Sequence, residues 1–196
     1  MLKETVHDKI EDLSNRLNCS LTTTKGKFNL TFNIRNLDFV SYVLELDKED
    51  FEFQGNCEML AGTSDKPSYF SGNTSVQNRF SITCKYKNHD NLPEFSIYES
   101  GLLSRLVCKK HLTIKSINSE FIKHLKNRKE VNFLEERVKN TGEISPAINC
   151  KKIDGLKELT IYFQSFSIEL DLFEKMIELS QNLETAYNDV HVDQAL

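Results

Sequence analysis

The spacing of apolar residues first indicates an N-terminal helix. Apolar positions recur there at intervals of three and four, which is typical of one face of an α-helix. The stripe consists of Leu2, Val6, Ile10, Leu13 and Leu17. Because it is narrow, close to the two-in-seven seam of a coiled coil, we expect this amphipathic helix to lie on a single neighbour. That neighbour could belong to this chain or to another.

From residue 28 onwards the pattern changes to an alternation of apolar and polar residues, which predicts strands buried on one face. The predicted strands of the first half are residues 28–34, 40–46, 51–53, 80–86 and 95–97. The short segment 36–38 is the predicted turn of an antiparallel hairpin between the first two strands. The middle of the chain is therefore rich in antiparallel strands.

The second half mixes short helices with strands. Its predicted elements are a helical stripe over 102–107, a strand over 112–116, a helix over 119–125 with Ser119 as N-cap, and a final strand over 159–163. Residues 131–138 fit a helix or a strand, and the stretch 142–155 is interpreted as irregular. Asp171 with Glu174 forms a capping box that opens a long C-terminal amphipathic helix.

This order of elements predicts an α+β fold, because the regular strand–helix alternation of a doubly wound sheet is missing. We expect one domain over residues 1–196. Residues 62–78 form the longest segment without periodicity, so they are either a long loop within that domain or a subdivision of it.

Composition narrows the classes of function. The chain has 196 residues and only seven glycines, and no two of these stand closer than seven positions apart. Phosphate-binding loops, dinucleotide-binding turns and nucleophile elbows need closely spaced glycines, so those motifs are excluded. The charged N-terminus and the lack of a long apolar run favour a cytosolic protein with no membrane segment, and five cysteines without an export signal favour reduced thiols.

The net charge of −4 conceals a strong segregation of charge. Eight basic residues and one acid lie between Arg105 and Lys129, whereas residues 169–196 hold seven acids and one lysine. We name as candidate partner-binding residues Lys109, Lys110, Lys123, Lys126, Arg128 and Lys129. The segment could bind nucleic acid through phosphate neutralisation, or it could be a solvated surface partly complemented by the acidic C-terminal helix. Aromatic residues that would stack on bases are sparse in it, since only Phe121 is present.

One set of residues has the chemistry of a metal site. Cys84, His89, Cys108 and His111 provide thiolate and imidazole, the ligands that zinc prefers, although their mixed Cys–His pairing departs from the usual spacing of structural sites. The alternative places Cys84 inward on a strand, ends an apolar helical stripe with Cys108 and leaves both histidines in solvent.

No concentrated catalytic motif is present, so we assign no catalytic residues and expect no cofactor. The favoured function is a noncatalytic, cytosolic protein-interaction module, such as an adaptor or an inhibitor of the immunity-protein type. One alternative is a nucleic-acid-associated protein that uses residues 105–129, and a second is an enzyme with an unrecognised Cys/His site. The terminal helices could also pack together or form a bundle between two copies in a homodimer.

Overall fold

One antiparallel sheet of eight strands forms the centre of the computed structural model, which describes residues 5–29, 36–60, 77–87, 92–100, 110–141 and 144–192. The strands are β1 (Ser20–Asn29), β2 (Asn36–Asp47), β3 (Phe51–Leu60), β4 (Asn78–Tyr86), β5 (Phe95–Glu99), β6 (Leu112–Ser116), β7 (Ala147–Ile153) and β8 (Leu156–Ser165). Their order across the sheet is β1-β2-β3-β4-β8-β7-β5-β6. The described helices are α1 (Val6–Leu17), α3 (Ser119–Asn127), α4 (Lys129–Thr141) and α5 (Leu170–Val192). The predicted α+β class is confirmed.

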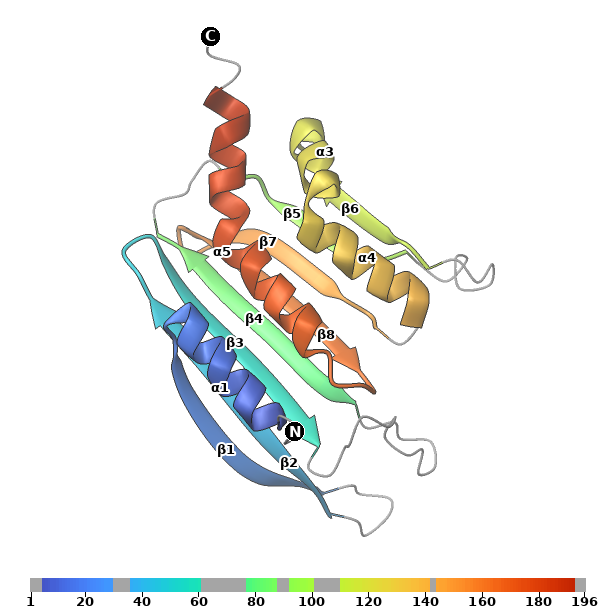
Figure 1. The fold of residues 1–196 in the computed structure, drawn as a ribbon. Helices are drawn as coiled ribbons and strands as arrows, with labels where there is room; N and C mark the ends of the chain where they lie inside the picture. Colours follow the sequence, from blue (N-terminus) through green and yellow to red (C-terminus); the bar gives the residue numbers. More distant parts are fainter. Residues whose placement is uncertain are drawn as a thin grey trace.

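These helices all cover the same face of the sheet (Figure 1). Helix α1 lies over the β1–β3 end, α5 crosses the centre, and α3 and α4 lie over the β5–β7 end. Contacts of α1 with β1, of α5 with β4 and of α3 with β6 fix this arrangement, and α4 packs against both α3 and α5. The molecule is therefore built from two layers, with one helix layer on one sheet.

The core lies between the two layers. Phe80 of β4 stacks on Phe163 of β8 with ring centroids 4.7 Å apart, and Phe173 of α5 packs against Phe80 at 5.6 Å. The Tyr86 hydroxyl donates a hydrogen bond of 2.6 Å to the backbone carbonyl of Ser180. All five side chains are buried, so the alternation that predicted β4 and β8 marks the face that α5 covers.

The first hairpin differs from its prediction. Strand β1 begins at Ser20, and β2 begins at Asn36, which pairs with Asn29. Residues 36–38 are thus part of β2 and do not form the turn, while residues 30–35 lie outside the described part of the chain. The early start of β1 escaped detection because its threonines are exposed at the edge of the sheet and show no apolar alternation.

Two helix starts also differ from their predictions. The N-cap of α3 is Asn118, whose side chain accepts hydrogen bonds of 3.0 Å from the backbone N–H groups of Glu120 and Phe121. Helix α5 begins at Leu170, so Asp171 stands in its first turn and is not the N-cap. The ambiguous segment 131–138 is helical, within α4.

Strand β7 was missed by the sequence prediction, which treated 142–155 as irregular. Ile148 and Cys150 are fully buried, and they alternate with residues on the other face of the sheet. The two-residue turn of Asp154 and Gly155 joins β7 to β8, with φ values of 50° and 88°. Positive φ at both positions is the requirement of a type I′ hairpin, for which Asp-Gly is a preferred sequence.

The remaining sequence expectations concern connections and helix stripes. The strands on either side of the 62–78 segment, β3 and β4, pair directly with each other. The apolar stripes of α1 and α5, including Ile10, Leu13, Phe173 and Leu183, are buried against the sheet of the same chain. Among the described helices, none has both the length and the apolar character needed to span a membrane. The predicted helical stripe 102–107 lies outside the described residues.

Candidate interaction surface

The face of the sheet opposite the helices, here called the open face, carries polar residues across its whole width. Strand register places one residue from each strand in a continuous row. In sheet order the row is Ser20, Glu45, Gln54, Thr83, Thr160, Asn149, Ser96 and Lys115. No described helix lies over this face (Figure 1). The open face therefore presents hydrogen-bonding groups from β1 to β6.

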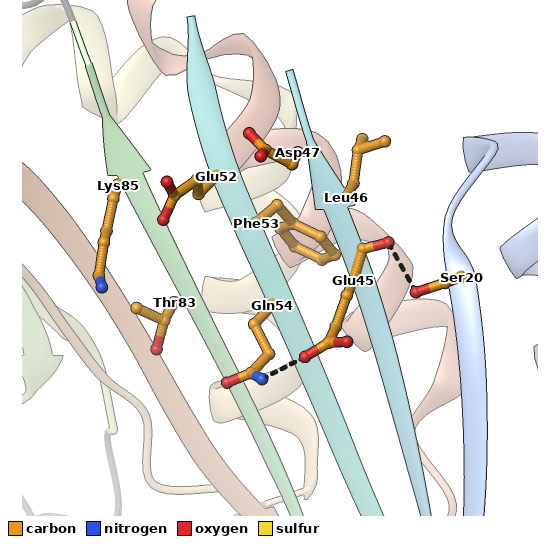
Figure 2. A pocket seen from close by; sticks show the side chains of 9 residues that line it. All are labelled: Ser20, Glu45, Leu46, Asp47, Glu52, Phe53, Gln54, Thr83 and Lys85. Atoms are coloured by element: carbon orange, nitrogen blue, oxygen red, sulfur yellow. Dashed lines mark hydrogen bonds between the residues drawn. The ribbon is translucent and has the colours of Figure 1, made fainter. Parts of the chain in front are cut away.

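One end of the open face is hollowed and acidic. The hollow, of about 490 Å³, lies over β2, β3 and β4, and its carboxylates come from Glu45, Asp47 and Glu52 (Figure 2). Gln54 donates a hydrogen bond of 2.8 Å to Glu45, and Lys85 is the single cation in the lining. We call this region the acidic hollow. Lys87 pairs with Asp47 at 2.6 Å and lies 3.8 Å from Glu52, so two of these three carboxylates already face a lysine.

The other end of the open face carries two tyrosines. Tyr162 of β8 and Tyr98 of β5 both pair with Ala147 of β7, which stands between them. Strands lie about 4.8 Å apart, so the two tyrosine backbones are roughly 10 Å apart. Tyr162 is 37% exposed and accepts a hydrogen bond from Gln164. The Lys115 ammonium lies 5.2 Å from the centroid of the Tyr98 ring. We call this region the tyrosine end.

The predicted basic residues divide into two groups. Lys110 pairs with Glu99 at 3.2 Å, Arg128 with Glu130 at 3.0 Å and Lys129 with Glu178 at 3.7 Å. Lys123 and Lys126 are exposed on α3 and have no ion pair with a described carboxylate. Lys109 lies outside the described residues.

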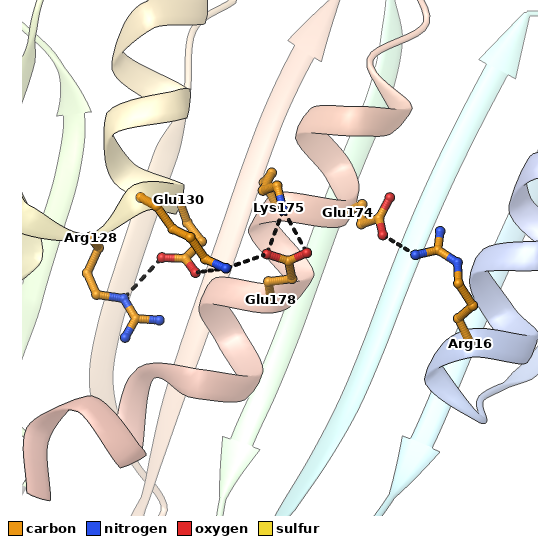
Figure 3. A network of polar contacts seen from close by, with 7 residues as sticks. Arg16, Arg128, Glu130, Glu174, Lys175 and Glu178 are labelled. Carbon is orange, nitrogen blue, oxygen red and sulfur yellow. Dashed lines mark hydrogen bonds and ion pairs between the residues drawn. The ribbon is translucent and has the colours of Figure 1, made fainter. Parts of the chain in front are cut away.

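Arg128 and Lys129 belong to a network of charges within the helix layer (Figure 3), whereas the Lys110–Glu99 pair lies at β5 of the sheet. Glu130 is fully buried between the Arg128 guanidinium and the Lys129 ammonium, and Glu178 on α5 connects Lys129 to Lys175. Elsewhere in this layer, Arg16 of α1 donates to Glu174 of α5. The Lys129–Glu178 pair is a direct contact between the basic segment and the acidic C-terminal helix. Arg128 neutralises a buried carboxylate in this layer, whereas the exposed Lys129 contributes little to stability.

The Cys/His set has only two described members. Cys84 is fully buried among core side chains, and its thiol lies 3.9 Å from the Ser180 carbonyl. Burial raises the pKa of the Cys84 thiol to about 12, which opposes the thiolate that zinc binding requires. His111 is exposed just before β6, whereas His89 and Cys108 lie outside the described residues. Within the described ranges, no group of three or more His, Cys, Asp or Glu side chains is placed to hold a metal ion.

Sequence reasoning missed the tyrosine end because its residues are far apart in the chain. The alternation of Thr160, Tyr162 and Gln164 with buried residues does place Tyr162 on the polar side of β8. It does not show that β7 separates β8 from β5, nor that Lys115 of β6 reaches the Tyr98 ring. In comparisons with known proteins, no family model, curated protein or solved structure matches this chain.

Proposed function

We propose that this chain is a noncatalytic binding protein that recognises a macromolecular partner on the open face of its sheet. The observation that carries the proposal is the eight-residue polar row, which crosses every strand of the sheet. A face intended for another layer of the same chain would carry apolar residues, as the helix-covered face does. A broad polar face with donors and acceptors at regular spacing suits an external polar partner.

The chemistry of the described thiols supports a noncatalytic function. Nucleophilic cysteines need a lowered pKa and access to solvent. Cys57, Cys84 and Cys150 are instead fully buried, Cys19 is half-buried against the core, and burial raises the pKa of each of these thiols. They act as small apolar residues in the core.

The class of partner is a separate question. The expectation of a protein partner, as for an adaptor or an inhibitor, comes from the sequence and stays a prediction. The acidic hollow supports it, because a lysine or arginine side chain of a partner could contact Glu45 there, which has no ion pair with a described cation, whereas Asp47 and Glu52 pair with Lys87. The nucleic-acid alternative is favoured by a different observation, the tyrosine end, and is argued in the next subsection.

A site-specific photo-crosslinker tests the use of the open face. Thr83 lies at the centre of the polar row, and Asn132 is an exposed residue of α4 in the helix layer. With the crosslinker at Thr83, we expect a discrete product in native lysate that excess unlabelled protein competes away. With the crosslinker at Asn132, that product should be absent. Equal products from both positions would contradict the proposal, and so would the absence of a product from Thr83 if no ligand binds elsewhere on the open face.

A further inference from the structure

We propose that the tyrosine end of the open face binds single-stranded nucleic acid, with bases stacked on Tyr162 and Tyr98 and phosphates neutralised by the neighbouring lysines. The inference rests on the proposed function, because it assigns a class of partner to the same face. It also extends the expected location of binding from lysines of the 105–129 segment to residues that four strands bring together.

The two tyrosines are placed as a stacking platform. Both project from an antiparallel sheet on the side that no described helix covers, and the small Ala147 between them is exposed. Aromatic side chains on an open antiparallel sheet are a recurring way to hold unpaired bases, because every base has a π-face that can stack. The backbones of the two tyrosines are about two strands apart, so their rings can contact different bases, and a base stacked on Tyr98 would share that ring with the Lys115 ammonium or displace it.

Cations accompany the aromatic residues at this end. Lys115 projects from the same face and lies over the Tyr98 ring, and Lys151 of β7 is exposed four residues from Ala147, where it stands opposite Glu158 of β8. Neither lysine has an ion pair with a described carboxylate. A nucleic-acid phosphate can therefore bind them without breaking a salt bridge within the described part of the protein.

The exposed lysines of α3 extend this positive charge beyond the sheet. Helix α3 contacts β6, the edge strand that carries Lys115, and Lys123 and Lys126 project into solvent from it. A single-stranded nucleic acid that crosses the tyrosine end and continues past the β6 edge of the sheet would pass these lysines. The carboxylates of the acidic hollow make the opposite end of the face less favourable for a polyanion, although Lys85 and Lys87 offset part of their charge.

Stacking of bases on the two tyrosines favours single-stranded nucleic acid over a duplex. In a duplex each base is stacked on its neighbours, so its π-face is not available to a protein ring without unstacking. In a single strand the bases turn outward freely, and their edges can reach the side chains of Asn149 and Thr160, which stand one row away from the tyrosines.

Fluorescence anisotropy with labelled oligonucleotides tests the inference on the full chain. The probes are a mixed-sequence single-stranded RNA and DNA of about 20 nucleotides, longer than one such site, and the matching DNA duplex. We expect salt-dependent binding of the single-stranded oligonucleotides and weaker binding of the duplex. Comparison of the RNA and DNA oligonucleotides shows which of the two nucleic acids the protein prefers. Tyr98→Thr and Tyr162→Thr should each weaken single-strand binding about tenfold, whereas Tyr98→Phe and Tyr162→Phe should retain it.

A matched pair of lysine variants tests the role of charge. Lys115 and Lys48 both lie over an aromatic ring, at 5.2 Å from Tyr98 and 5.4 Å from Phe51, but at opposite ends of the sheet. We expect Lys115→Gln to reduce the slope of log affinity against log salt by about 0.7, the value for one phosphate contact in a single strand. Lys48→Gln should leave affinity and slope unchanged.

Several results would overturn the inference: no binding of single strands at about 50 mM salt, equal binding of the duplex, or undiminished binding by both threonine variants. Circular dichroism and retained binding by the phenylalanine variants exclude misfolding as the cause of a loss. If oligonucleotides do not bind but the crosslinker at Thr83 still captures a protein that the Asn132 crosslinker does not, the nucleic-acid inference fails and the proposed function stands. If both experiments fail, the proposed function fails too.

Discussion

At the scale of single residues, burial decides what a charged side chain does. Arg128 belongs to the basic segment that the sequence nominates for partner binding, yet it is the hydrogen-bonding partner of the buried Glu130 carboxylate. Lys129, its neighbour, is 77% exposed and makes only longer contacts of 3.7 and 4.0 Å. A buried carboxylate without a close cation is strongly destabilising, whereas an exposed ion pair contributes little. Arg128 is thus a stabilising residue.

We therefore predict a large difference between two otherwise similar substitutions. Arg128→Met should lower the free energy of unfolding by about 3 kcal/mol, because Glu130 loses its closest cation while staying buried. Lys129→Met, the control, should cost less than about 0.5 kcal/mol. Urea denaturation followed by circular dichroism measures both. Losses of equal size would show that Glu130 does not depend on Arg128.

Cys84 is a second residue whose role depends on its neighbours. Its sequence position, five residues before His89, is compatible with a ligand pair, and its place in an alternating strand is compatible with a core residue. The structure places it fully buried, against the backbone of α5. The alternative that put Cys84 on the inner face of a strand therefore holds for this residue.

At the scale of elements, the sequence located most helices and strands but placed their ends less well. Both Asn118 and Ser119 are suitable N-cap residues, and the pattern alone favoured the second. The choice is decided by the backbone of Asn118, which is extended and lets its side chain accept from Glu120 and Phe121. The wrong N-cap shifts the predicted start of α3 by one residue.

Substitution of the cap measures its contribution. Asn118→Ala should lower the free energy of unfolding by about 1 kcal/mol, because two N–H groups of the first turn of α3 lose their acceptor. Asn118→Asp retains the acceptor and should be nearly neutral, and Ser119→Ala should also be nearly neutral. Thermal or urea unfolding of the three variants provides the measurement. A larger loss for Ser119→Ala would restore Ser119 as the cap.

The missed strand β7 shows where pattern reading fails at this scale. Only two residues of β7, Ile148 and Cys150, are buried, so its apolar alternation is short. The Asp154–Gly155 turn was the stronger local signal, because that dipeptide favours a two-residue hairpin. Because the sequence prediction did not use this turn, it missed β7, the strand that separates the two tyrosines of the open face.

At the scale of the whole molecule, the two faces of the sheet differ in how much they contribute to stability. The helix-covered face forms the core, where Phe163 stacks on Phe80 and is fully buried. The open face contributes little packing. Tyr162, which precedes Phe163 in β8 and lies on the open face, is 37% exposed. Adjacent residues of one strand thus differ in what they stabilise, because successive side chains point to opposite faces.

This difference predicts opposite effects of neighbouring substitutions. Phe163→Ala should lower the free energy of unfolding by about 3–5 kcal/mol, since it leaves a cavity between the sheet and α5. Tyr162→Ala should cost about 1 kcal/mol or less and should instead impair binding of single-stranded nucleic acid. Denaturant titrations measure the stability of the two variants, and fluorescence anisotropy measures their binding of single-stranded nucleic acid. Similar losses of stability would show that the open face is structurally required.

The sequence by itself determined the α+β class, the type of most elements and the charge segregation, because apolar periodicity and composition are local properties. Only the tertiary structure decided which strands are neighbours, and so placed Tyr162, Tyr98 and Lys115 at one end of the open face. Among the described residues of the basic segment, it separated the paired cations Lys110, Arg128 and Lys129 from the lysines exposed on α3. Such outcomes depend on strand order and burial, which bring together residues far apart in the chain and leave no mark in the local pattern.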